Sequence, residues 1–203
     1  MSAPGLRAFW LKHLHRWHWI SAAMSLVGMV LFAATGITLN HAGAIEAAPK
    51  VTSRTAQLPE NLLAALNASQ QSAMLPEDVL QWIATHVGVS IGGSKVEWQK
   101  GEVYVSLPRP GGDAWLTIDS KSGDIEYELT DRGWISYLND LHKGRHAGLW
   151  WSLFIDAFAV VCLIFCTTGF FLLQLHSTRR PATWPLVGFG VVVPIALLLL
   201  FVH

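Results

Sequence analysis

The chain has 203 residues, of which 52% are hydrophobic and 14% are charged, and its 14 Lys and Arg residues balance its 14 Asp and Glu residues. Zero net charge argues against a protein that follows nucleic-acid phosphates, and two cysteines are too few for a disulfide framework or a zinc ribbon. The charges are unevenly spread, because 13 of the 14 acidic residues lie between Glu46 and Asp140 and the last is Asp156. The sequence therefore predicts apolar ends around a polar middle.

The N-terminal part predicts a membrane-spanning helix over residues 17–39 that follows a tail over residues 1–16. No charged residue occurs between Arg16 and Glu46, and about 20 apolar residues cross a hydrocarbon core of about 30 Å. A cleaved signal peptide is the alternative, because the small residues 42–44 resemble a cleavage site. The apolar stretch is longer than an ordinary signal-peptide core, so we expect it to remain as an anchor.

Residues 42–141 predict a small exported α+β domain that begins with a polar linker. The linker over residues 42–73 contains a weak helix over 60–67, and a stronger helix starts after Pro76 and ends at Gly88. Alternation within residues 95–99 and 102–107 predicts a hairpin. Two further strands are expected over 114–119 and 125–129. One helix against a small antiparallel sheet is the expected unit.

The C-terminal part predicts a second span over residues 148–175, a loop over 176–183 and a third span over 184–202. The expected fold class is thus a membrane α-helical protein with three transmembrane helices and an inserted α+β domain. Basic residues concentrate on the cytoplasmic side of membrane proteins. They flank the first span and separate the second from the third, at Arg7, Lys12, Arg16, Arg179 and Arg180. We therefore expect a cytoplasmic N-terminus and a periplasmic domain over 42–141.

The polar middle and the spans together resemble a known family. The segment "AWLTIDSKSGDIEYE" resembles the last strands and turn of a PepSY domain. The first span, "HLHRWHWISAAMSLVGMVLFAATGITLNH", is similar to the His-Arg-Trp start and Thr-Gly finish of the PepSY-associated transmembrane family, and the second contains "LHKGRHAG" and "TTGFFL". The resemblance implies a bacterial inner-membrane protein with a PepSY-like periplasmic domain.

Histidines gather at the ends of the first two predicted spans. Neutral imidazole is a strong axial ligand of haem iron, and neighbouring helices can bury a porphyrin between them. We therefore expect haem b to be held by histidines of an inner set, at the cytoplasmic ends, and an outer set, at the periplasmic ends. The inner set is His15, His18 and His176, and the outer set is His41, His142 and His146.

Within these sets we expect His41 and His142 to form the outer ligand pair, with His146 as the main substitute. The expected inner pair is His15 or His18 with His176. The two ends are distant, because the 23 residues from His18 to His41 span roughly 34 Å of helix. Direct electron transfer between them would need tilted helices, aromatic relays or a second protomer.

Two further patterns bear on haem loading. The face that carries His15 and His18 continues through small residues such as Ser25 and Gly36, which leave room for a macrocycle or, alternatively, allow close helix packing. Relatives with a histidine in the third span also exist, as the resemblance implies, whereas this chain has Trp184 there. Four arginines are expected either to pair with haem propionates or to set topology: Arg16, Arg145, Arg179 and Arg180.

Asp156 is the single acidic residue inside a predicted span. A carboxylate within the membrane is costly, so it indicates function by default. On one continuous helix it would lie about 40° around the axis from His142, fourteen residues earlier. We expect it to bind a proton or orient a ligand histidine, and pairing with a neighbouring helix is the alternative.

The resemblance implies electron transfer across the membrane or to its periplasmic side, and larger relatives imply a component of a ferric or ferric-siderophore reductase. No GxGxxG motif follows a strand, so electrons are expected from quinol or a redox partner protein. One alternative is a membrane-anchored PepSY module that acts on a periplasmic partner such as a peptidase, without a cofactor. Another is a metal sensor or chaperone using the outer set. Membrane lipid is an expected partner, a homo-oligomer is compatible with the sequence, and nucleic acid is not expected as a partner.

Overall fold

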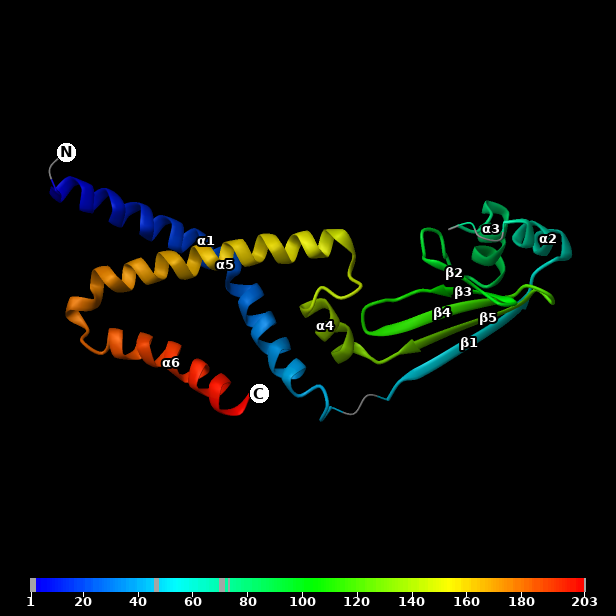
Figure 1. Ribbon diagram of the computed structural model, residues 1–203. Helices are drawn as coiled ribbons and strands as arrows, with labels where there is room; N and C mark the ends of the chain where they lie inside the picture. The colour runs from blue at the N-terminus through cyan, green and yellow to red at the C-terminus, as the bar shows by residue number, and fades with distance from the viewer. Residues whose placement is uncertain (1–2, 46–47, 70–71, 73, 203) are drawn as a thin grey trace. The chain divides into compact units, whose positions relative to one another are not determined.

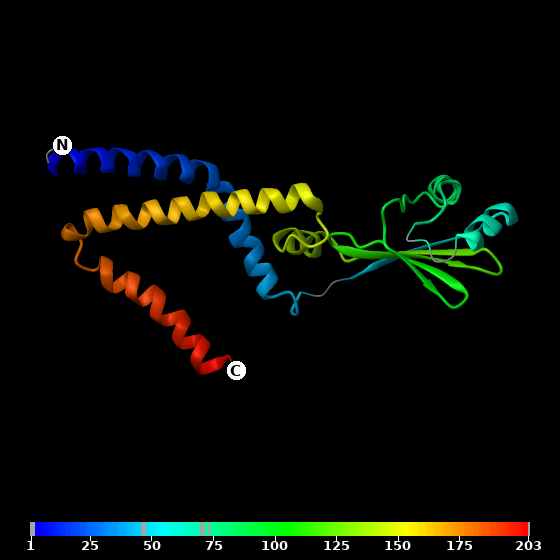
Figure 2. The ribbon, with the colours of Figure 1, turned by 45° about the horizontal axis from the view of Figure 1, so that its top comes forward.

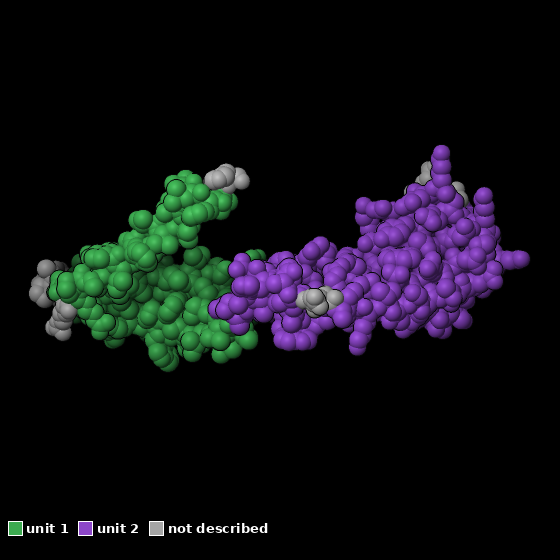
Figure 3. Space-filling model, turned by 90° about the horizontal axis from the view of Figure 1, so that it is seen from below, with its two compact units in different colours: residues 1–31, 154–203 green, residues 32–153 purple. Residues whose placement is uncertain are grey.

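The computed structural model describes residues 3–45, 48–69, 72 and 74–202, and the chain divides into two compact units (Figures 1 and 3). Residues 1–31 and 154–203 form the first unit, and residues 32–153 form the second. The division falls within α1 (Ala3–Asn40) and within α5 (Gly148–His176). The first unit therefore holds most of the apolar helices, and the second holds the polar domain with the adjoining ends of α1 and α5.

Three described helices are long and apolar enough to cross a membrane, as predicted: α1, α5 and α6 (Thr183–Phe201). The chain is thus a membrane protein. A 3₁₀ helix over Ser177–Arg179 lies between α5 and α6. With 38 residues, α1 is about 57 Å long, so most of the predicted tail over 1–16 is helical. Among the described residues of α6 none is buried, which suits a lipid environment.

The described strands of the second unit form one antiparallel sheet in the order β1-β5-β4-β3-β2, which is labelled in Figure 1 and seen from another direction in Figure 2. The predicted hairpin and the two later strands are present. The bounds are β1 (Lys50–Gln57), β2 (Val96–Gln99), β3 (Glu102–Ser106), β4 (Gly112–Asp119) and β5 (Asp124–Asp131).

The prediction of a linker over residues 42–73 is wrong at β1, which pairs with β5 from Lys50 opposite Asp131 to Gln57 opposite Asp124. Seven of its eight side chains are exposed, so its sequence lacks the apolar alternation by which strands are recognised. Backbone pairing at the sheet edge holds it instead. Residues 46, 47, 70, 71 and 73 of the predicted linker lie outside the described residues.

Two helices, α2 (Glu60–Ala68) and α3 (Glu77–His86), lie against one face of the sheet (Figure 1). The core between them and the strands consists of fully buried aliphatic side chains: Leu66, Val79, Ile83, Val103, Val105, Leu116 and Ile118. This apolar layer makes the sheet and its two helices one packed α+β unit.

A further helix, α4 (Trp134–His142), was not predicted. It has only nine residues, and Asn139 and Asp140 interrupt its apolar positions, so its pattern in the sequence is too short to indicate a helix. The backbone between α4 and α5 turns at Gly144, His146 and Gly148, whose φ angles are +67°, +55° and +80°. No single helix therefore joins His142 to Asp156, and the 40° relation, which holds for one continuous helix, does not apply.

Candidate functional site

His18 of α1 is held against α5 by its ring face and by one nitrogen. Its ring stacks on that of Phe165, with centroids 4.6 Å apart and planes 15° apart. Nδ1 lies 3.2 Å from both the Phe165 carbonyl oxygen and Oγ1 of Thr168. A carbonyl only accepts hydrogen bonds, so Nδ1 carries the proton. Nε2 then keeps the lone pair with which a neutral imidazole binds a metal.

Gly169 allows this close approach of the two helices. A Cβ atom at this position would lie 3.2 Å from Cε1 of His18, closer than ordinary van der Waals contacts. Any larger residue would push the imidazole away from Phe165 and Thr168. The Thr-Gly pair of the second span thus fixes where His18 sits.

His15 and His176 approach each other beside His18. Their ring centroids are 6.0 Å apart and their planes are nearly perpendicular, at 86°. In each, Nδ1 lies 2.8 Å from the carbonyl oxygen four residues earlier. His86 of α3 makes the same local bond at 3.0 Å in the polar domain. That bond is therefore a general feature of helical histidines, whereas Nδ1 of His18 contacts a second helix instead.

A cavity of about 590 Å³ opens at this place, within the range of about 300–1,000 Å³ typical of small-molecule sites. Two imidazoles, one guanidinium and apolar walls line it. The lining residues are His18, Gly169, Leu172, Leu173, His176, Arg180 and Thr183. Two members of the predicted inner set thus share one cavity, and the third lies against one of them. Arg180, one of the four predicted propionate partners, is the cation of this cavity.

Close packing occupies the next part of the α1–α5 contact. Ser25 is fully buried, and its hydroxyl donates a hydrogen bond to the Ser21 carbonyl at 2.7 Å. A Cβ atom at Gly28 would lie only 2.4 Å from Cε2 of Phe158. At Ser25 and Gly28, the small residues of α1 therefore allow close helix packing. This was the alternative to the hypothesis that small residues leave room for a macrocycle.

In the outer set, His142 at the end of α4 lies against the last turns of α1. Its Nδ1 is 2.6 Å from Oγ1 of Thr35, and its ring centroid is 4.8 Å from that of Phe32. One turn away, the Thr38 hydroxyl donates to Oδ1 of Asn139 at 2.8 Å. This network binds α4 to α1. A neighbouring cavity of about 370 Å³ includes Asn139 but no histidine among its described lining residues.

The remaining predicted residues lie apart from these contacts. His41 is exposed, with Nδ1 2.9 Å from the Ile37 carbonyl oxygen, and His146 is exposed in the turn before α5. The pairing of His41 with His142 stays a prediction. Asp156 is exposed on α5, and no hydrogen bond or ion pair joins its carboxylate to a described residue. The side chain of Arg179 lies outside the described part of the chain.

Trp184 packs edge-on against Phe170 of α5, with ring centroids 5.7 Å apart. It thus fixes the start of α6 beside Thr183, which lines the cavity. Across the described ranges, no group of three or more His, Cys, Asp and Glu side chains is arranged to hold a metal ion. Among these residues, neither the outer set nor the inner set forms such a group.

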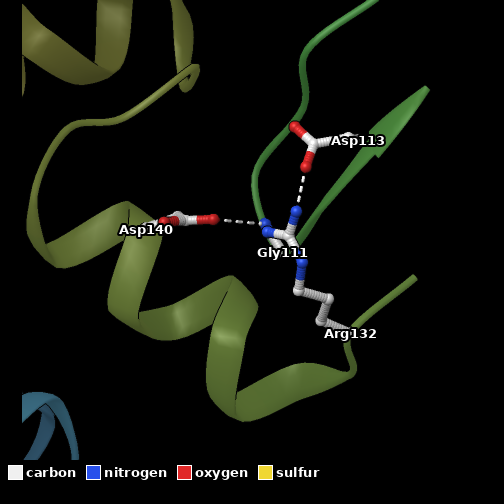
Figure 4. A network of polar contacts seen from close by, with 4 residues as sticks. All are labelled: Gly111, Asp113, Arg132 and Asp140. Atoms are coloured by element: carbon white, nitrogen blue, oxygen red, sulfur yellow. Dashed lines mark hydrogen bonds and ion pairs between the residues drawn. The ribbon is translucent and has the colours of Figure 1, made fainter. Parts of the chain in front are cut away.

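The sequence reasoning missed the polar contacts that dock α4 on the sheet (Figure 4). Oδ2 of the buried Asp140 accepts a hydrogen bond from the Gly111 amide at 2.9 Å. Gly111 has a φ of +74°, and a Cβ atom there would lie 2.8 Å from Cα of Tyr137. Beside it, Arg132 forms an ion pair with Asp113. The signal available in the sequence was an acidic residue, Asp140, close to apolar residues.

Comparison with known proteins agrees with this architecture. A family model described as PepSY_TM-like matches residues 9–203, which include the three apolar helices and the sheet. No curated protein and no solved structure matches the chain. Because the family model covers nearly the whole sequence, the chain belongs to the PepSY_TM-like family.

Proposed function

We propose that the chain binds haem b in the cavity beside His18 and His176 and takes part in electron transfer in the bacterial inner membrane. The observation that carries this proposal is the meeting of two imidazoles and a guanidinium around one apolar-walled cavity. Bound haem supplies reversible one-electron chemistry at its iron, while a protein supplies ligands, orientation and dielectric. Cavity size, donor type and charge all fit this group.

The residues of the cavity have separate tasks in this proposal. The carbonyl of Phe165 orients His18 so that Nε2 is free to ligate iron, as outer hydrogen bonds do in other metal sites. His176 is the second ligand, and His15 is its neighbour. Leu172 and Leu173 exclude water, and Arg180 pairs with a propionate.

The electrons move outward in this proposal, toward a ferric or ferric-siderophore substrate on the periplasmic side. The positions of the basic residues support a cytoplasmic N-terminus and a periplasmic sheet domain. Quinol or a redox partner protein is the donor. Because about 34 Å of helix separates His18 from His41, the proposal includes a second carrier at the outer set or in another protomer.

The second candidate is a membrane-anchored PepSY module that binds a periplasmic partner without a cofactor. One observation favours it. β1 pairs with β5 on one side, and its other edge is unpaired among the described strands. An extended peptide can add to such an edge through main-chain hydrogen bonds.

A visible absorption spectrum separates the two candidates. The full chain is produced with haem precursor supplied, purified in detergent, and recorded first oxidised and then reduced with dithionite. Haem binding predicts a Soret band and, after reduction, an α band of b type. A haem-free spectrum, also after titration with haemin, would leave the binding module as the better account.

A further inference from the structure

An apolar groove lies between the first turns of α1 and the end of α5, in the first unit. Its volume is about 560 Å³, and apolar atoms make up nearly all of its surface. The lining residues are Leu6, Arg7, Trp10, Leu14, Phe171, Gln174 and Leu175. It shares no lining residue with the cavity at His18, so it is a separate site.

The two polar residues that line the groove, Arg7 and Gln174, lie toward the same end of it. On α1, Arg7 lies nearer the helix start and Leu14 nearer the middle of the span; on α5, Gln174 lies nearer the helix end and Phe171 deeper. Leu6 to Leu14 covers about 12 Å of helix, close to the depth of one leaflet, half of a hydrocarbon core of about 30 Å. A ligand with a polar head and one apolar chain matches this gradient.

The charge around the groove favours an anionic head. No acidic residue occurs in residues 1–45 or 157–203, whereas Arg7, Lys12 and Arg16 lie in the first half of α1. The Arg7 guanidinium forms no ion pair with a described residue, so it is available to a phosphate. A neutral quinol head would leave this cation unmatched, and a second copy of the same basic surface would repel it.

The geometry points to a binding site for one anionic glycerophospholipid, with its phosphate at Arg7 and one acyl chain along Trp10, Leu14 and Phe171. Every membrane protein touches lipid, but this concave surface under a free cation would retain one molecule selectively. The site does not depend on haem. It would tie the ends of α1 and α5 together beside the cavity.

Native mass spectrometry of the full chain tests the site. Protein in detergent is mixed with equal amounts of dioleoyl phosphatidylglycerol and dioleoyl phosphatidylcholine, which differ only in the headgroup. We expect one phosphatidylglycerol per chain to be retained. Arg7→Gln should lower its retention about fivefold, which corresponds to about 1 kcal/mol per basic residue near a membrane surface. Lys12→Gln, which removes an equal charge outside the groove, should have less than half that effect.

Photo-crosslinking supplies a readout that needs no variant. Phosphatidylglycerol with a diazirine on the acyl chain should label the peptides that contain Leu14 and Phe171. Any one of five results would overturn the inference. These are equal retention of both lipids, equal losses in the two variants, labelling confined to other helices, a lipid-free dimer, and displacement of the lipid by a short-chain ubiquinone analogue.

Discussion

The contact between Gly28 and Phe158 gives the sharpest test of how α1 and α5 pack. A Cβ atom at Gly28 would lie 2.4 Å from Cε2 of Phe158, about 1.1 Å closer than a normal carbon contact of about 3.5 Å. Gly36→Ala is the matched control, because its Cβ would lie at an ordinary 3.7 Å from Cε1 of His142. Both changes improve helix propensity by about 1 kcal/mol.

Overpacking costs about 1–3 kcal/mol, so Gly28→Ala should be less stable than Gly36→Ala by that amount. Unfolding of the full chain in mixed micelles, followed by tryptophan fluorescence, measures the difference. In a Phe158→Leu background the Gly28→Ala penalty should shrink, since the ring that it meets is gone. Equal stability of the two alanine variants, or no rescue by Leu, would refute close packing at this level.

Three further predictions concern contacts within the second unit. Asp140→Ala leaves the Gly111 amide without its buried acceptor and should lower the free energy of unfolding by about 1–3 kcal/mol. Hydrogen exchange at that amide should accelerate, whereas Asp140→Asn should largely preserve its protection. Hydrogen bonds from the Ser122 and Lys121 amides lower the pKa of Asp119 from its ordinary 3.8. The contribution of Asp119 to stability is therefore present above pH 3.8 and is lost as the pH falls through the lowered pKa. The thermal unfolding temperatures of Asp119→Ala and of the unaltered chain should differ at pH 7 and converge in acid. Thr35→Val removes the partner of His142, so the imidazole NMR signals of that residue should shift while those of His86 stay in place.

The elements with a clear apolar pattern could be predicted from the sequence. The spans are long apolar runs with Asp156 as their single charged residue, and the hairpin alternates in register around its Lys-Gly turn. β1 could not be predicted, because nearly all of its side chains face solvent and only its backbone joins the sheet. α4 could not be predicted because it has only nine residues and Asn139 and Asp140 interrupt its apolar positions.

The candidate site could be predicted in part. Histidines stand out at the ends of apolar spans, so the inner set was named from the sequence alone. The contact of His18 with Phe165 and Thr168 could not be predicted, because it depends on how α1 is rotated against α5. That rotation follows from close contacts such as that of Gly28 with Phe158, which the periodicity of the sequence does not indicate.

The central claim is that His18 and His176 hold haem in one cavity. The most direct test is the reduced-minus-oxidised spectrum of His18→Ala and His176→Ala, with His86→Ala as the control that removes a helical histidine from the polar domain. The account predicts that each cavity variant loses or shifts a b-type signal while the control keeps the spectrum of the unaltered chain. Three identical haem spectra would contradict it.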